Sequence, residues 1–530
     1  MPITVEVTGE FLVESSLARV NRGLFGALAR REEIDLGILP EPTIAPLVGN
    51  DDDTLLQTRR TWRFLPEPQV TIRHRWPAVF PKTNSSAYVH MQPWEFGSLP
   101  KLWAEGAKAV ADEVWCYSTY IADMYVRAGV ARERVHVVPL GYDPQIFKPG
   151  PAPLSATLRD RIAFLYVGDT IARKGVDVAV NAYLATFTAR DNVVLIVKDF
   201  GGKDPGSDTR LRDHVASLGG RRDIPPVLYI DTYYTDSALA DLYRAATALV
   251  APYRGEGFGL PILEAMACGV PTIATRGGAS DDFTTKDTTI HIDAKRISLG
   301  TSYGGMELVD EAFLLEPDEM QVGAAMRRIY ENPKLAQAMS AKSADYARDW
   351  TWERGAERAL ARLEALAKMT PLAKGRKDGP SGTETFELKI VSRGGEDGVL
   401  LELLRRLGVD DPFYIECVAP GESESISPFF SRALGWRGAV IEGDSAAYAE
   451  FSEKLKSAAP PTEFELLALG PNSDPAWSRL APYKPKVIVT VGKDAPKALA
   501  KSAGYTCIGI ESKGSSAFFV RDDLVLRSRF

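Results

Sequence analysis

The sequence predicts an α/β protein made of several parallel-sheet domains, and three observations support that prediction. Short β-branched runs alternate with longer amphipathic segments along most of the chain, which is the pattern of βαβ units. The chain has 530 residues, enough for three or four domains at about 150 residues each. One stretch, residues 368–383, mixes proline, glycine, serine and charged residues without periodicity and is typical of a linker.

The composition is that of a globular protein. Hydrophobic residues make up 45% and charged residues 25% of the chain, and the net charge is −7. This mildly acidic balance gives no indication of nucleic-acid binding. No stretch approaches 18 consecutive apolar residues, so no transmembrane segment is expected. The first residues resemble a strand rather than a signal peptide, and the four cysteines are widely spaced. We therefore expect a cytoplasmic protein.

The elements follow in order along the chain. A strand at 3–7 and a helix at 15–31 begin the first domain, and a loop rich in proline and glycine at 141–153 marks its end. The remaining strands are expected at 87–90, 113–118 and 135–139, then at 161–168, 192–198, 227–230 and 246–252. A helix is expected at 176–188, and a helix-prone tail runs over 318–368 with breaks near 332–333 and 350–352. A third block, 386–530, has strand candidates at 413–417, 438–444, 487–491 and 517–520.

The most informative segment is RGEGFGLPILEAMACGVPTIAT, residues 254–275. Its three glycines free the backbone for a tight turn, and Pro261 suits the first turn of a helix. The amides near Gly259 and Leu260 then point out of a helix N-terminus, where a phosphate is favoured. Glu256 in the turn and Glu264 in the helix can accept hydrogen bonds from the hydroxyls of one ligand.

This segment resembles the Glu-x7-Glu motif of the retaining glycosyltransferases of family four, which have the GT-B fold of two facing Rossmann-like domains. The resemblance implies transfer from a nucleotide-sugar donor (a UDP- or GDP-sugar) with retention of configuration by front-side displacement, and no metal. It also implies that Glu256 contacts the donor sugar and Glu264 the ribose. The donor-binding residues expected in this segment are Glu256, Gly257, Phe258, Gly259, Leu260 and Glu264.

A second segment, residues 164–183, resembles the Gly-Arg-x-x-x-x-Lys-Gly turn of the same family, whose two cations grip the donor diphosphate. Lys174 and Gly175 align with its Lys-Gly pair. Asp169 stands where the family carries arginine, which is a departure, and the adjacent Arg173 is a candidate for the second positive charge. Such cations stabilise the charge that builds on the leaving group.

The acceptor side is expected in the first domain. Gly9 follows the first predicted strand and is expected to face the interdomain cleft, and the resemblance implies that such a glycine lies near the donor phosphates. His90 ends a predicted strand, at the place where the family carries an active-site histidine. The resemblance therefore implies a catalytic set of His90, Glu256 and Lys174. Polar and aromatic side chains that suit sugar recognition are Arg73, His74, Trp76, Trp94 and Glu95.

The third domain resembles the FkbM-type methyltransferases that use S-adenosylmethionine. A working cofactor site needs glycines after the first strand, but Val418 and Pro420 stand there, and proline also removes a backbone donor. Glu442 could still hold a ribose. We expect a degenerate domain, kept for acceptor binding or assembly, with S-adenosylmethionine binding not expected.

The expected domains are 1–149, which with a helix at 347–368 crossing back to it forms the acceptor side, 150–346 for the donor, a linker at 369–385, and 386–530. The run Asp51–Asp53 is interpreted as a solvated turn and not as a metal site. Two alternatives remain open: a bifunctional glycosyltransferase–methyltransferase, and a non-catalytic binding or scaffold protein. The donor base, the sugar, the acceptor (a glycan, a protein or another hydroxyl) and any oligomer formed through the C-terminal domain are not fixed by the sequence.

Overall fold

The structure is a computed structural model. It describes residues 2–11, 13, 15–40, 61, 65, 67–78, 80, 85–151, 158, 161–200, 209–368, 414–418, 438–442, 466–469, 485–491, 505–510 and 516–522. The expected linker at 369–385, most of the third block and the run Asp51–Asp53 lie outside these residues. None of the described helices is long and apolar enough to cross a membrane.

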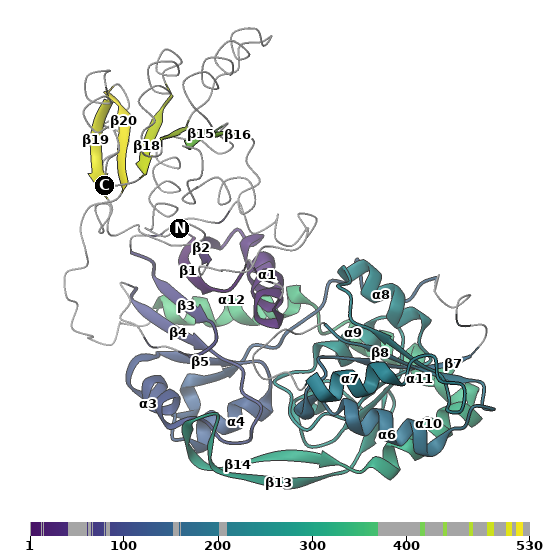
Figure 1. Ribbon diagram of the computed structural model, residues 1–530. Coiled ribbons are helices and arrows are strands. Elements are labelled where there is room, and N and C mark those ends of the chain that lie inside the picture. The colour runs from purple at the N-terminus through teal and green to yellow at the C-terminus, as the bar shows by residue number, and fades with distance from the viewer. Residues whose placement is uncertain are drawn as a thin grey trace.

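The first sheet has six parallel strands in the order β2-β1-β3-β4-β5-β6 (Figure 1). The strands are β1 (Ile3–Gly9), β2 (Ile34–Pro40), β3 (Val70–His74), β4 (Ala87–Met91), β5 (Glu113–Cys116) and β6 (Val135–Val137). Its helices are α1 (Ser16–Ala29), α3 (Lys101–Val110), α4 (Thr119–Arg127) and the short η1 (Arg132–Arg134). Strand β2 lies on one side of β1, and β3 to β6 lie on the other side, so the strand order reverses between β1 and β3. Gly9 and His74, which end these two strands, therefore lie where ligands of open α/β sheets bind.

The second sheet repeats this design, with parallel strands in the order β12-β11-β10-β7-β8-β9. The strands are β7 (Ile162–Val167), β8 (Val193–Lys198), β9 (Val227–Ile230), β10 (Ala248–Ala251), β11 (Thr272–Thr275) and β12 (Thr289–Ile292). The accompanying helices are η2 (Ala172–Lys174), α6 (Val176–Thr186), α7 (Thr209–Ser217), α8 (Asp236–Ala245), α9 (Leu260–Ala267), η3 (Ala279–Asp282), α10 (Glu319–Glu331) and α11 (Pro333–Ala347). The predicted pair of Rossmann-like domains is confirmed. The second reversal falls between β7 and β10, and both motif turns follow these two strands.

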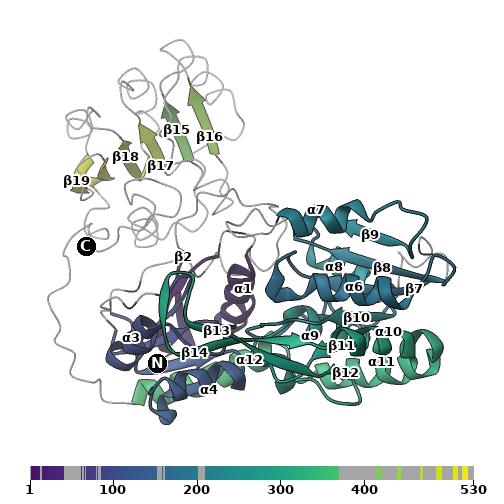
Figure 2. The same cartoon turned by 60° about the horizontal axis from the view of Figure 1, so that its bottom comes forward.

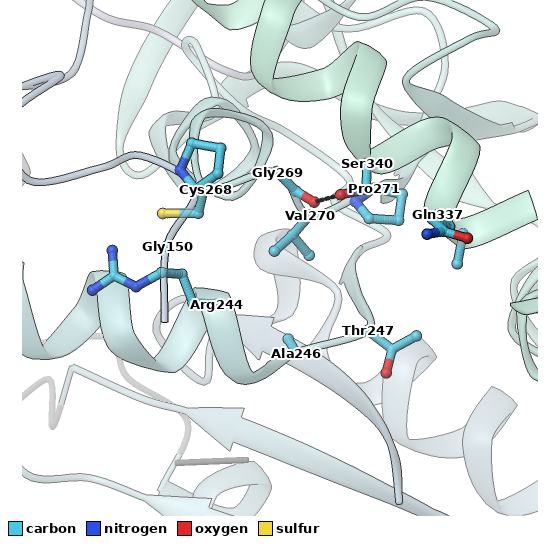
Figure 3. A pocket seen from close by; sticks show the side chains of 12 residues that line it. Gly150, Arg244, Ala246, Thr247, Cys268, Gly269, Val270, Pro271, Gln337 and Ser340 are labelled. Carbon is cyan, nitrogen blue, oxygen red and sulfur yellow. Dashed lines mark hydrogen bonds between the residues drawn. The ribbon is translucent and has the colours of Figure 1, made fainter. Parts of the chain in front are cut away.

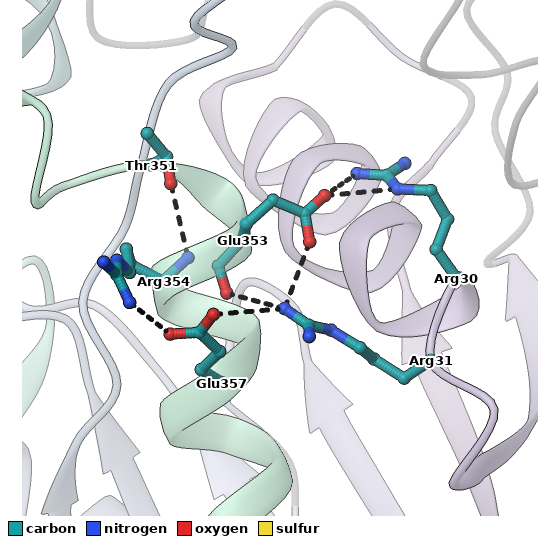
Figure 4. A network of polar contacts seen from close by, with 6 residues as sticks. All are labelled: Arg30, Arg31, Thr351, Glu353, Arg354 and Glu357. Carbon is teal, nitrogen blue, oxygen red and sulfur yellow. Dashed lines mark hydrogen bonds and ion pairs between the residues drawn. The ribbon is translucent and has the colours of Figure 1, made fainter.

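The helix α12 (Trp352–Lys368) packs against α1 of the first domain. Gly23 of α1 allows the close approach, because a Cβ there would lie 2.3 Å from the Trp352 ring. Arg30 and Arg31 at the end of α1 both bind the Glu353 carboxylate, as Figure 4 shows. Helix α12 follows the second domain in the sequence, but packing and charge join it to the first domain.

A two-stranded antiparallel ribbon, β13 (Ala294–Tyr303) and β14 (Met306–Pro317), was not foreseen from the sequence. It leaves the second domain after β12 and extends along α3 and α4 of the first domain (Figures 1 and 2). Gly304 and Gly305 form its turn, both with positive φ, as a two-residue hairpin loop requires.

The third sheet has the order β16-β15-β17-β18-β20-β19. Its strands are β15 (Tyr414–Val418), β16 (Gly438–Glu442), β17 (Leu466–Leu469), β18 (Val487–Val491), β19 (Tyr505–Ile510) and β20 (Ser516–Arg521). The first four are parallel, and β20 runs antiparallel to both β18 and β19. The strands expected at 413–417, 438–444, 487–491 and 517–520 are therefore present, as β15, β16, β18 and β20.

Candidate active site

The two motif turns of the second domain lie against each other. Gly175 has a φ of +73°, and a Cβ there would lie 1.9 Å from the carbonyl oxygen of Pro252, so only glycine fits. The amides of Arg254 and Gly255 both donate to the carbonyl oxygen of Arg173, at 2.7 and 3.2 Å. Lys174 Nζ lies 2.5 Å from Glu256 Oε1. Two segments that are about 80 residues apart in the chain thus place a cation and a carboxylate side by side.

The helix α9 begins at this turn without a side-chain cap. Gly259 has a φ of +101° and occupies the N-cap position, Leu260 is the first helical residue, and Pro261 lies in the first turn. A glycine cap offers no side-chain oxygen to the first amides, which leaves the helix N-terminus suited to an anion. Phe258, by contrast, is buried against Phe283, so a donor can meet it only through its backbone.

Glu264 is buried one turn into α9 and is bound from both domains. Arg19 Nη2 of α1 lies 2.8 Å from Glu264 Oε1, and the Tyr243 hydroxyl donates to Oε2 at 3.0 Å. Arg19 also pairs with Asp236 at 3.0 Å. Burial raises the pKa of Glu264 to about 7, although the Arg19 charge acts to lower it. The carboxylate that the sequence assigned to the ribose is therefore also an interdomain contact.

Arg173 reaches from the second domain to the first. Its guanidinium donates to the carbonyl oxygen of Gly255 at 3.2 Å and lies 3.6 Å from the Glu95 carboxylate. Burial works against its charge, but Glu95, Glu256 and Asp169 outweigh burial and raise the pKa of Arg173. Two of the side chains singled out in the sequence, Arg173 and Glu95, thus meet across the cleft beside the Lys174–Glu256 pair.

On the first domain, Gly9 and His74 lie together at the ends of β1 and β3. A Cβ on Gly9 would lie 2.2 Å from the His74 carbonyl oxygen. His74 Nδ1 lies 2.5 Å from Asn21 Oδ1, and Nε2 contacts the Tyr117 hydroxyl. Burial, with a smaller contribution from His90, lowers the pKa of His74 to about 3, so this imidazole is neutral at physiological pH.

His90 has different surroundings. Its ring is 1% exposed and packs against the rings of Phe80, at a centroid distance of 4.5 Å, and Tyr125. Neither ring nitrogen has a hydrogen-bond partner among the residues that the structure describes, and burial lowers the pKa of His90 to about 3. Its catalytic role stays a prediction, and the structure adds His74, at the reversal point of the sheet, as a competing candidate.

Substitution of each histidine separates these possibilities. We expect His90→Phe to raise the free energy of unfolding by about 1 kcal/mol or more, because two buried, unpaired ring nitrogens are removed. The stabilisation should grow below about pH 6, because a histidine whose pKa is lowered on folding destabilises the native state as pH falls through its unfolded value. Urea denaturation measures this effect.

Activity measurements on the same variants test the catalytic role. A loss of sugar transfer in His90→Phe would support the prediction that His90 is catalytic, whereas a loss confined to His74→Ala would assign that role to His74.

The tryptophans proposed for sugar recognition are not equivalent. Trp94 is fully buried, so its ring is not available to a ligand, whereas Trp76 is 42% exposed. The two rings are stacked, with centroids 5.8 Å apart and planes 14° apart. Arg73 lies beside the buried Glu6 carboxyl, whose pKa burial raises to about 7. Of the acceptor-side candidates, Trp76 alone combines a flat ring with substantial exposure.

Several residues of the site do not belong to any motif that can be recognised in the sequence. Arg19, Asn21 and Tyr117 contact Glu264 or His74, but each lies far in the chain from its partner. Arg254 binds both Asp177 and Glu316 and so fixes the turn to α6 and to the ribbon. In the sequence, Arg254 could have been singled out as a site residue only because it directly precedes the glycine turn.

Two further observations limit which groups and which pocket belong to the site. Among the described residues, no three His, Cys, Asp or Glu side chains gather in a way that could hold a metal ion. A pocket lined by Arg244, Cys268, Gly269 and Ser340 lies at the C-terminal end of α9, as Figure 3 shows. Glu256 and Gly259 precede the other end of that helix, so we assign this pocket no part in the chemistry.

Solved structures with the same architecture identify the class of fold. The sucrose-phosphate synthase of Thermosynechococcus elongatus superposes with a TM-score of 0.50 at 18% identity, over 69% of this chain and 99% of that chain. A glycosyltransferase from Rickettsia africae gives a TM-score of 0.50 at 12% identity, over 69% and 99%. The first two domains therefore have the GT-B fold.

Comparisons of sequence give more specific similarities, including a family match within the second domain. Residues 161–299 match the family model described as "Glycosyl transferases group 1". A D-inositol 3-phosphate glycosyltransferase of Catenulispora acidiphila is 32% identical over 195 residues, which is 35% of this chain and 47% of the relative. A mannosylfructose-phosphate synthase of Agrobacterium fabrum is 27% identical over 255 residues, 46% of this chain and 50% of the relative. The chain thus spans about half the length of these curated relatives.

Proposed function

We propose that this protein is a retaining glycosyltransferase that moves a sugar from a UDP- or GDP-sugar to an acceptor hydroxyl. The observation that carries the proposal is the Lys174–Glu256 pair, 2.5 Å apart, beside the uncapped N-terminus of α9. A cation, a helix N-terminus and a carboxylate at one point suit a sugar diphosphate, which presents an anion next to hydroxyl groups. The names of the relatives, all of glycosyl-transferring enzymes, support it.

Different residues bind the diphosphate, the donor sugar and the ribose. Lys174, Arg173 and the amides at Gly259 and Leu260 neutralise the diphosphate, whose negative charge grows as the glycosidic bond breaks. Glu256 accepts hydrogen bonds from the donor sugar, and Glu264 accepts them from the ribose. The acceptor hydroxyl attacks the anomeric carbon from the face that the diphosphate leaves and passes its proton to the leaving diphosphate, so no carboxylate nucleophile is needed. A histidine of the first domain, His90 or His74, positions the reacting sugar.

The cations of the chain can take the place of a metal. Lys174 lies within the site, and the Arg173 guanidinium keeps its charge because Glu95 and Glu256 favour it. We therefore propose that transfer is metal-independent. Activity should be unchanged by a chelator, whereas a requirement for Mg²⁺ or Mn²⁺ would overturn this part of the proposal.

For the third domain we propose a methyltransferase-like fold without a working cofactor site. The sheet order reverses between β15 and β17, and the carboxyl end of β15 is where a cofactor would bind in such a sheet. There Val418 is still a strand residue, paired with Glu442 of β16, and the sequence continues with Ala419 and Pro420 where glycines would be expected. Calorimetry with S-adenosylmethionine tests this: competable binding would restore the bifunctional alternative.

Donor recognition tests the main proposal directly. We would incubate the purified full-length chain with a panel of UDP- and GDP-sugars and measure donor binding and slow hydrolysis. At least one donor is expected to bind and to release its sugar with the anomeric configuration retained. If the protein is folded by circular dichroism and binds none of these donors, the proposal fails.

A further inference from the structure

The β13–β14 ribbon is fixed to both domains. At its base, the amide of Leu315 donates to the carbonyl oxygen of Arg254 at 2.9 Å. Further along, the amides of Val309 and Phe313 donate to the carbonyl oxygens of Leu99 and Phe96 of the first domain, both at 2.9 Å. The ribbon therefore crosses from the donor turn to the segment 94–101 of the first domain.

The ribbon completes an aromatic cluster on that segment. The ring of Tyr303, at the end of β13, lies 4.1 Å from the ring of Phe96 and 6.5 Å from that of Trp94. Trp76 stacks on Trp94, and Trp103 meets both tryptophans edge-on. Trp94, Phe96 and Trp103 are buried and form a rigid base, whereas Trp76 is 42% and Tyr303 is 38% exposed. Two rings from different domains thus remain open to solvent on one packed support.

The cluster adjoins the candidate active site. Glu95 lies between two members of the cluster, Trp94 and Phe96, and its carboxylate pairs with Arg173 at 3.6 Å. Tyr303 also lies close enough to Arg173 that an ionised phenol would raise the pKa of the guanidinium. Arg173 is next in sequence to Lys174, which pairs with Glu256. The cluster is therefore connected to the reaction centre through Glu95 and Arg173, and it lies on the first-domain side, where an acceptor is proposed to approach.

We propose that Trp76 and Tyr303 form an acceptor subsite for a saccharide, so that the acceptor is a glycan rather than a protein side chain or a small metabolite. The inference rests on the proposed function and specifies its acceptor. A sugar ring has an apolar C–H face that packs on a flat aromatic ring, while its hydroxyls remain in water. Exposed rings held rigidly by buried neighbours suit such a ligand because little conformational freedom is lost on binding. Only the ribbon brings Tyr303 to this place.

A panel of oligosaccharides tests the subsite. The full-length protein, saturated with UDP and GDP, would be applied to an array of immobilised α- and β-linked oligosaccharides of glucose, mannose, galactose and rhamnose. Binding to at least one class is expected. Trp76→Ala and Tyr303→Ala should each weaken it about fivefold, since an aromatic contact contributes about 1 kcal/mol. Absence of binding to every saccharide, or undiminished binding by both variants, would overturn the inference.

Matched variants separate this inference from the proposed function. Ile297→Ala changes an exposed side chain on the same ribbon, 46% exposed and outside the aromatic cluster, and should leave saccharide binding unchanged. Donor hydrolysis in the absence of acceptor should be the same in Ile297→Ala as in the unmodified protein. Donor hydrolysis without saccharide binding would refute the subsite alone, whereas absence of donor binding would refute the proposed function.

Discussion

Replacing Lys174 by alanine is expected to lower kcat/KM for sugar transfer by about 10²- to 10³-fold, the usual cost of removing one preorganised charge-stabilising group. The ammonium lies 2.5 Å from Glu256 and beside the N-terminus of α9, where the diphosphate is proposed to bind. Its charge matters most as the glycosidic bond breaks, because the leaving diphosphate then carries more negative charge. The loss should therefore appear in kcat as well as in KM. Initial rates over a range of donor concentrations measure both.

Two variants make the Lys174 result interpretable. Lys342→Ala removes an exposed lysine that pairs with Asp287 on the surface, and should leave the rate unchanged. Glu256→Gln keeps the shape of the partner and removes its charge, and should also impair transfer, because Glu256 is proposed to hold the donor sugar. Equal kcat/KM in Lys174→Ala and the unmodified protein would remove Lys174 from the diphosphate site.

The motif turns were predictable because local backbone geometry dictates them. Gly175 and Gly259 both adopt positive φ, and glycine is the residue that adopts this conformation without strain. A Pro after Gly259 marks the start of α9 for the same local reason. Alternation of apolar strands and amphipathic helices likewise predicted both α/β domains, and the resemblance of the motif turns implied the GT-B fold. Where the neighbours in sequence determine the structure, the sequence was sufficient.

Contacts between distant segments were not predictable. The pairing of Arg19 with Glu264 joins α1 to α9 and depends on how the two domains face each other. The ribbon did leave a signal, since Gly304 and Gly305 are flanked by two long polar strands, a pattern typical of a hairpin. Its docking on Phe96 and Leu99 left none. The enclosure of His90 by Phe80 and Tyr125 is a tertiary effect of the same kind.

Replacing Arg19 by methionine is expected to destabilise the protein by about 3–5 kcal/mol at pH 8, because removing one partner of a buried pair leaves the other charge uncompensated. Glu264 is 1% exposed, and with Arg19 absent its one remaining hydrogen-bond partner among the described side chains is the Tyr243 hydroxyl, while Asp236 adds a like charge. The missing contact also joins the two domains. Urea denaturation followed by tryptophan fluorescence measures the change.

The destabilisation should depend on pH, with a sign fixed by the Glu264 carboxyl. Burial raises its folded pKa to about 7 from an ordinary value of 4.5, so the native state binds the extra proton between these values. Stability contributed by this group therefore falls as pH rises through that window. Loss of Arg19, whose charge lowers the pKa of Glu264, should raise that pKa further. At pH 5.5 the carboxyl is then neutral, and Arg19→Met should cost much less than at pH 8.

A double-mutant cycle assigns the effect to the pair. In the Glu264→Gln background the group at position 264 has no charge, so adding Arg19→Met should cost little and the cost should be the same at pH 5.5 and pH 8. Glu6, His74 and His90 also titrate with shifted pKa values, but they are present in all four proteins and cancel in the differences. An Arg19→Met cost that is equal at both pH values, or unchanged by Glu264→Gln, would show that Arg19 stabilises the protein through its packing on Phe147 or its pair with Asp236 and not through the Glu264 carboxylate.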